Sequence, residues 1–142
     1  MEILKQVALS FLNVPYKYGG KNPIAGIDCS GLVSEILRSA GVIPLKGELN
    51  AQELFNLLEP TASQNVYGMG SVVFYGESVT KINHVAFCLD SYRMIEAGGG
   101  SPLCLTVQDA AHQSAFVKIR LIKCGLNIAA ILKPRYAPIG VI

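Results

Sequence analysis

One cysteine and one histidine are placed where they could act together as a nucleophile and its base. Cys29 follows a glycine-containing loop and opens a segment in which apolar residues recur every three or four positions as far as Ala40. The amino-terminal end of a helix carries a partial positive charge, which favours the nucleophilic thiolate form of a cysteine. Asp28 is placed to cap this helix. The alternative is that Cys29 is a small packing residue, and spacing alone does not separate the two.

His84 is the candidate base. The chain has two histidines, and His84 begins the run HVAFCL, which is typical of a buried strand. A catalytic imidazole must be held on a rigid element within reach of the thiol. A structural histidine at a strand end is a common alternative, but a helix-start cysteine upstream makes His84 half of a candidate Cys-His couple.

A third side chain should orient the imidazole, and Glu96 is the first candidate. It lies twelve positions after His84, on the next predicted strand, and Asp90 supplies a turn residue between the two strands. A turn centred on Asp90 places position 96 opposite position 84, where cross-strand neighbours meet. Glu96 as a solvated strand residue is the alternative, and His112, in a helix or loop stretch, is the other candidate for this role.

The elements that must position these residues change in type along the chain. Helical periodicity covers residues 3–12 and 29–40, and a third helix begins after Asn50, where Glu53 completes a capping box, and ends at Pro60. Strand-like segments follow at 71–75, 84–89, 93–97, 115–122 and 128–132. This order predicts an α+β domain with its amino-terminal helices packed on an antiparallel sheet of about five strands. Gly125 and Asn127 predict a hairpin between the last two strands.

Composition excludes several classes of function. The 142 residues are 51% apolar and 15% charged, which predicts one folded domain over 1–142 and argues against disorder. Lys and Arg are scattered, with a net charge of +2, which argues against nucleic-acid binding. No apolar run approaches the roughly 18 residues of a membrane span. The four cysteines show no CxxC spacing, so we expect no metal and no other cofactor. The first residues lack the features of a signal peptide, which predicts synthesis in the cytoplasm.

Several motifs together resemble the NlpC/P60 family of cell-wall cysteine peptidases. They are PYKYGG at 15–20, GIDCSGLV at 26–33, SVVFYG at 71–76, HVAF at 84–87 and MIEA at 94–97. The resemblance implies a papain-like α+β fold, with Cys29 as nucleophile and His84 as general base. It also implies that Tyr16 helps to hold the oxyanion or the substrate, and that Asp28 and Ser30 line the substrate pocket. The implied substrate is the γ-D-glutamyl to diamino-acid bond of peptidoglycan stem peptides.

The chain departs from this family at the third catalytic position, where His, Asn or Gln is usual and Glu96 stands here. The segments IEAGGG, FVKIR and LKPRY resemble members found with phage or prophage tail genes, which would make phage tail or other assembly proteins its partners. Two alternatives stay open: a related cysteine amidase or acyltransferase, and a wall-binding or structural module of a phage tail assembly. For a wall peptidase, we expect action at the cell wall after delivery or release by a route other than a signal peptide.

Overall fold

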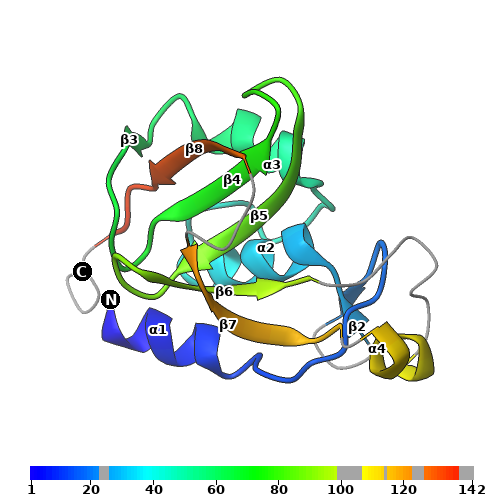
Figure 1. Ribbon diagram of the computed structural model, residues 1–142. Coiled ribbons are helices and arrows are strands. Elements are labelled where there is room, and N and C mark those ends of the chain that lie inside the picture. The colour runs from blue at the N-terminus through cyan, green and yellow to red at the C-terminus, as the bar shows by residue number, and fades with distance from the viewer. Residues whose placement is uncertain (23–25, 99–106, 114, 123–126, 138–142) are drawn as a thin grey trace.

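The computed structural model describes residues 1–22, 26–98, 107–113, 115–122 and 127–137. Within them, helices cover one face of an antiparallel sheet whose strand order is β3-β8-β4-β5-β6-β7 (Figure 1). The helices are α1 (Glu2–Leu9), α2 (Cys29–Ser39), α3 (Ala51–Leu58) and α4 (Val107–Gln113). The strands of the sheet are β3 (Ser63–Gln64), β4 (Val72–Gly76), β5 (Ile82–Cys88), β6 (Arg93–Ala97), β7 (Val117–Leu121) and β8 (Ile128–Lys133). A separate pair, β1 (Lys21–Asn22) and β2 (Gly26–Ile27), precedes α2. The predicted α+β class is confirmed.

Side-chain caps fix where the two central helices begin. The Asp28 carboxylate accepts a hydrogen bond from the Gly31 N–H and caps α2. Asn50 caps α3 and forms a capping box with Glu53, in which each side chain accepts from the backbone N–H of the other residue. These bonds satisfy donors that a helix leaves without an intrahelical partner. Both predicted caps are confirmed.

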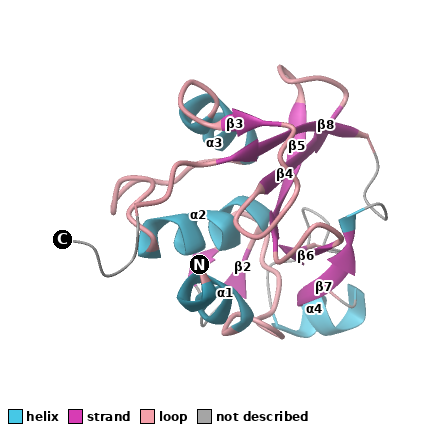
Figure 2. Cartoon of the chain, turned by 90° about the vertical axis from the view of Figure 1, so that its left-hand side faces the viewer, coloured by secondary structure: helices cyan, strands magenta, loops and turns pink. Residues whose placement is uncertain are grey.

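The main core lies between the sheet and the helices. Alternate residues of the strands face α2 and α3, which pack over β5 in the middle of the sheet (Figure 2). The largest side chains of this core with no exposed surface are Ile27, Leu32, Ile36, Leu37, Leu54, Phe74, Phe87 and Ile95. Burial of this apolar face fixes α2, and therefore its first residue, against the strand that carries His84.

A second apolar cluster lies on the other face of the sheet. Its members are Val73, Tyr75, Ala86, Cys88, Met94, Ile122 and Ile131. They alternate along the strands with residues of the main core, as a pleated strand requires. His84 and Glu96 share the parity of this second set along β5 and β6.

One prediction about the sheet is wrong. The predicted hairpin between the last two strands does not form: β7 pairs with β6, whereas β8 lies between β3 and β4. Turn residues are compatible with a hairpin but do not require one, and here β7 and β8 lie on opposite sides of the β4–β5–β6 meander. The described part of the sheet has six strands where about five were predicted, because the exposed polar pair Ser63–Gln64 adds a short strand beside β8.

Candidate active site

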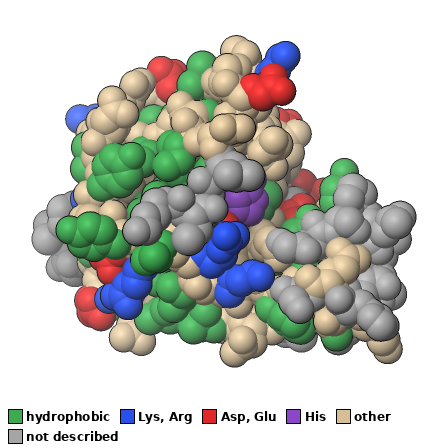
Figure 3. Space-filling model, viewed as in Figure 1, with side chains coloured by type: hydrophobic (Ala, Val, Ile, Leu, Met, Phe, Trp, Pro, Cys, Tyr) green, Lys and Arg blue, Asp and Glu red, His purple; other side chains and the backbone are tan. Residues whose placement is uncertain are grey.

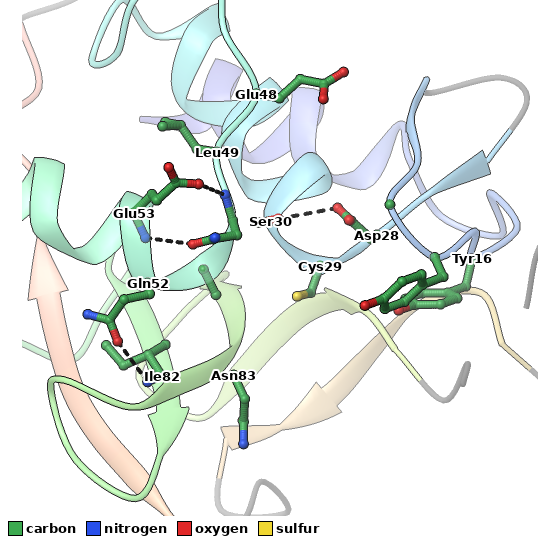
Figure 4. A pocket seen from close by; sticks show the side chains of 14 residues that line it. Tyr16, Asp28, Cys29, Ser30, Glu48, Leu49, Gln52, Glu53, Ile82 and Asn83 are labelled. Atoms are coloured by element: carbon green, nitrogen blue, oxygen red, sulfur yellow. Dashed lines mark hydrogen bonds between the residues drawn. The ribbon is translucent and has the colours of Figure 1, made fainter. Parts of the chain in front are cut away.

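Cys29 is the first residue of α2, so its side chain lies at the amino-terminal end of the helix. Asp28 Oδ1 accepts hydrogen bonds from the Gly31 N–H at 2.7 Å and from Ser30 Oγ at 3.3 Å, which hold the first turn of the helix. Cys29 is partly exposed, and its sulfur points into a pocket that Tyr16 also lines (Figure 4). The helix dipole therefore acts on a thiol that a substrate can reach.

Close backbone contact holds the loop at 15–20 against the start of α2. The Asp28 N–H donates to the Gly20 carbonyl at 2.9 Å. A Cβ on Gly31 would lie 2.7 Å from that same carbonyl oxygen and 2.9 Å from Asp28 Oδ1. Glycine is therefore required at position 31 for the loop to approach. This contact holds the loop at 15–20 and the start of α2 together and brings Tyr16 beside Cys29.

The pocket beside Cys29 has a volume of about 580 Å³. One wall carries Tyr16, Asp28, Cys29 and Ser30, and the opposite wall is formed by residues 48–53 together with Ile82 and Asn83 (Figure 4). The described lining contains three carboxylates and no Lys or Arg. The predicted site residues 16, 28, 29 and 30 thus lie together.

Gln52 is a residue of this pocket that sequence reasoning missed. Its Oε1 accepts from the Ile82 N–H at 2.9 Å, and its Nε2 donates to the Val79 carbonyl at 2.8 Å. The side chain therefore ties α3 to the turn that leads into β5. A helix residue that bonds to the backbone of a distant turn leaves no local pattern in the sequence.

A β-bulge precedes His84. Tyr75 pairs with His84, but the next pair along the strands is Gly76 with Ile82, so β5 carries one extra residue at Asn83. As a result Ile82 and Val85, three positions apart, both belong to the main core, although a regular strand would turn them to opposite faces. Bulges re-aim side chains and are frequent beside active sites.

His84 connects Cys29 to Glu96. Its Nε2 lies 2.7 Å from Glu96 Oε2, and its ring also forms a hydrogen bond with the Cys29 side chain. With Nε2 engaged by Glu96, Nδ1 is the ring nitrogen left for Cys29. Tyr75 packs beside the imidazole, with the ring centroids 5.6 Å apart. The three residues predicted as a triad are therefore brought together in the predicted order.

The electrostatics of this chain favour a charged imidazole. Burial lowers the pKa of His84, but the hydrogen bonds to Cys29 and Glu96 and the charges of both outweigh burial and raise it to about 10. Burial raises the pKa of Glu96, but its bonds and charge interactions with His84 and Arg120 prevail and lower it. The side chain of Glu96 is 3% exposed, so its carboxylate is largely shielded from water. Its alternative as a solvated strand residue is wrong.

The predicted register between β5 and β6 is wrong by two residues, although the contact it was used to predict exists. Phe87 pairs with Ile95 and Cys88 with Met94, so the turn is centred on residue 91. Asp90 opens the turn, where its Oδ1 accepts from the N–H groups of residues 92 and 93. His84 and Glu96 are therefore diagonal neighbours on one face, a separation that long side chains span.

Arg120 is a second residue that sequence reasoning missed. It lies on β7, and its Nη1 is 2.9 Å from Glu96 Oε1. The pairing of β6 with β7 brings it there, and the expected hairpin of the last two strands hid that pairing. Its alternation with Val117 and Ile119 along the strand is the one signal in the sequence that could have placed it on the outer face. The other candidate for the third role, His112, lies in α4, and its side chain lies outside the described residues.

A known protein family matches most of this chain. The sequence profile of the NlpC/P60 family matches residues 13–121, which include the loop at 15–20, α2 and strands β4 to β7. The chain belongs to the NlpC/P60 family. The matched range contains Cys29, His84 and Glu96.

Relatives and solved structures of this NlpC/P60 domain agree with the fold. The chain is 34% identical over 93 residues to the gamma-DL-glutamyl hydrolase of Bacillus subtilis, an alignment that covers 65% of this chain and 22% of that protein. It is 31% identical over 98 residues to the bifunctional muramidase/DL-endopeptidase CwlT of the same species, over 68% of this chain and 29% of that protein. The crystal structure of the P60 domain of an antigen from M. avium subspecies paratuberculosis superposes with a TM-score of 0.67 at 21% identity, over 96% of this chain and 95% of that one. The chain thus spans less than a third of the length of each of the two Bacillus subtilis relatives.

Neither a metal-ligand cluster nor a membrane-spanning helix is found among the described residues. No group of three or more His, Cys, Asp or Glu side chains there is arranged to hold a metal ion. Among the same residues, no helix is both long enough and apolar enough to span a membrane. The sequence favours a packing role over a ligand role for Cys104 and Cys124, and both residues lie outside the described part of the chain.

Proposed function

We propose that this NlpC/P60 domain is a cysteine peptidase that hydrolyses peptidoglycan stem peptides at the bond between a γ-D-glutamyl group and a diamino acid. The observation that carries the proposal is the chain of contacts from Cys29 through His84 to the buried carboxylate of Glu96. The names of the two Bacillus subtilis relatives, a gamma-DL-glutamyl hydrolase and a DL-endopeptidase, support the choice of bond.

Cys29 is the nucleophile in this proposal. The imidazolium of His84 and the amino-terminal end of α2 both stabilise a negative charge on its sulfur. The thiolate attacks the scissile carbonyl carbon, and the carbonyl oxygen becomes an oxyanion. The backbone N–H of Cys29 and the hydroxyl of Tyr16, which is directed toward the sulfur (Figure 4), stabilise that oxyanion.

His84 moves the proton in both halves of the reaction. As imidazolium it protonates the leaving amine while the carbon–nitrogen bond breaks, which leaves an acyl group on the Cys29 sulfur and a neutral imidazole. The imidazole then removes a proton from water, the hydroxide attacks the thioester, and the carbon–sulfur bond breaks. Glu96 accepts a hydrogen bond from Nε2 throughout, so that Nδ1 stays directed at the sulfur.

The pocket supports a cationic substrate. Asp28, Glu48 and Glu53 line it, and no Lys or Arg does so among the described residues. Stem peptides with free amino groups therefore meet complementary charge. Asp28 and Ser30 lie on the wall nearest Cys29, where they would contact the residues on one side of the scissile bond.

Digestion of purified stem peptides, with mass spectrometry of the products, tests the proposal. We expect one cut, between the γ-D-glutamyl group and the diamino acid, which Cys29→Ala and His84→Ala abolish while the circular dichroism spectrum stays that of the wild type. Cys88→Ala is the matched control, because Cys88 is a buried thiol on the opposite face of the sheet from the main core. Cleavage of simple amides or thioesters in place of stem peptides would assign the site to an amidase or acyltransferase. Binding to cell walls with no cleavage of any of these substrates would assign the domain to a structural role.

A further inference from the structure

The carboxylate of Glu96 has two partners on different strands. Oε2 faces His84 Nε2 at 2.7 Å, and Oε1 faces Arg120 Nη1 at 2.9 Å. The Glu96 side chain is 3% exposed, whereas that of Arg120 is 44% exposed. Arg120 pairs with Met94 across β6 and β7 and so reaches Glu96 diagonally on the same face. A shielded anion is thus held between the imidazole and a cation from the edge strand.

We propose that Arg120 is a positioning residue that acts on His84 through Glu96. By holding Oε1, the guanidinium prevents rotation of the carboxylate and directs Oε2 at Nε2. The positive charge of Arg120 also offsets part of the negative charge of Glu96. It therefore limits how strongly the Glu96 carboxylate retains the His84 proton, which the imidazolium must give to the leaving amine. The inference rests on the proposed function, because only a reaction with proton transfer from His84 needs such a limit.

A buried carboxylate makes this second cation necessary. Removing a carboxylate from water costs several kcal/mol, and one partner seldom offsets that cost. A neutral third residue would need no counter-charge, since burial of an amide or a neutral imidazole costs far less free energy than burial of a carboxylate. Glu96 and Arg120 therefore belong together: the arginine makes a carboxylate workable at a position that the imidazole shares.

Other groups face the same site from each element packed around it. Cys29 approaches from α2, Tyr75 from β4, and Lys118 stands opposite Glu96 in the β6–β7 register. Glu96 and Arg120 both act on the Tyr75 hydroxyl, whose pKa burial raises first and Glu96 raises further. In the space-filling view, Lys and Arg side chains lie beside a histidine at the surface of this face (Figure 3). Lys118 adds positive charge on this face, and the direct bond from Arg120 Nη1 to Glu96 Oε1 makes Arg120 the residue to test.

The sign of the expected change follows from charge. Removing Arg120 takes away a positive charge near the imidazolium and leaves Glu96 more basic, and both effects strengthen the hold on the His84 proton. The pKa of His84 therefore rises in Arg120→Gln. We expect a rise of roughly half to one pH unit, because the Arg120 charge acts on the imidazole from beyond Glu96. A merely structural role for Arg120 would lower activity without moving this titration.

The experiment measures the imidazole directly. Histidine side-chain NMR follows the titration in wild type, Arg120→Gln and Arg120→Lys, and the chain's two histidines are distinguished with His84→Ala. The dependence of kcat/KM on pH is measured on the same proteins with a purified stem peptide. Arg93→Gln is the matched control, because Arg93 is also a sheet arginine but bonds to Asp90.

We expect Arg120→Gln to raise the His84 titration midpoint and to lower kcat/KM at pH 7 roughly tenfold, a coupling typical of residues in one hydrogen-bond network. Arg120→Lys keeps the charge and restores the midpoint, and Arg93→Gln matches the wild type. In the Glu96→Gln background, Arg120→Gln should cost less than about twofold. An unmoved midpoint in Arg120→Gln, with or without loss of activity, would overturn the proposal. If no variant and no wild-type protein cleaves stem peptides, the proposed function fails, and the NMR midpoint still decides the role of Arg120.

Discussion

Replacing Glu96 with glutamine removes the charge of the third residue and nearly preserves its shape. Glu96 offers two oxygens, one to His84 and one to Arg120, and both of these partners donate. A glutamine amide has one acceptor oxygen, so one of the two donors must face its NH₂ group. We therefore expect the variant to fold, to lose most of its hold on the imidazolium, and to retain weak activity.

The size of the effect follows from His84. Its pKa rises from 6.5 to about 10, and at about 1.4 kcal/mol per pH unit the site favours the imidazolium by about 5 kcal/mol. Cys29 and Glu96 both contribute to this preference for the imidazolium. An adjacent opposite charge typically accounts for one to three pH units of such a pKa shift. In Glu96→Gln we expect the pKa of His84 to fall by roughly one to two units, opposite in sign to the shift expected for Arg120→Gln.

The assay is the alkaline limit of kcat/KM on a purified stem peptide, with the His84 NMR titration alongside. The limit should move down with the imidazole titration, and kcat/KM at pH 7 should fall roughly tenfold without reaching zero. Glu77→Gln is the matched control, since Glu77 is an exposed carboxylate that pairs with Lys81. An alkaline limit that stays in place in Glu96→Gln would refute the reasoning and move the third role to another residue.

Four further predictions test separate parts of the structure. Iodoacetamide should label Cys29 at least tenfold faster than Cys88 at pH 7, because Cys88 is fully buried and burial raises its pKa to about 12; peptide mapping measures both rates, and equal labelling would contradict an activated thiol. The pKa of His84 is higher in the folded chain than its ordinary 6.5, so its stabilising contribution is complete below pH 6.5 and is lost as pH rises through about 10. Urea titrations should show the free energy of unfolding falling over that window, and the fall should be smaller in Glu96→Gln. Gly31→Ala should destabilise the fold by about 1–3 kcal/mol, because its Cβ would lie 2.7 Å from the Gly20 carbonyl oxygen. Ser34→Ala in the same helix should be neutral or stabilising, because the buried Ser34 Oγ has no hydrogen-bond partner in the described chain. Equal losses of unfolding free energy in the two variants would count against the close contact at Gly31. Tyr16→Phe should lower kcat about tenfold with little change in KM if its hydroxyl holds the oxyanion, and an unchanged kcat would remove Tyr16 from that role.

Local patterns predicted the elements well. The apolar spacing from Cys29 to Ala40 indicates α2, and Asp28 and Asn50 were both identified as caps that the structure contains. Capping and periodicity depend on residues within one or two turns of each other, so they can be found without knowing the fold. The resemblance carried by the motifs around Cys29 and His84 predicted the family, which the match over residues 13–121 confirms.

Strand pairing could not be predicted in the same way. The segment that became β7 was expected beside β8 but pairs with β6, and the register of β5 with β6 differs from expectation by two residues. Strands β4 to β8 all have apolar residues that several partners could cover, so pairing depends on the packing of the whole sheet. For this reason Arg120, whose role exists only through the β6–β7 pairing, was missed.

By itself, the sequence determined which residues could do chemistry: a thiol at a capped helix start, an imidazole on a strand, and a carboxylate on the next. The tertiary structure decided their mutual geometry. A bulge at Asn83 interrupts β5 immediately before His84, the contact of Gly31 with the Gly20 carbonyl seats Tyr16 beside the sulfur, and β7 supplies the cation that balances Glu96. The physical reason is that helix caps and strand composition are local free energies, whereas distances between side chains depend on which surfaces are buried together across the whole chain.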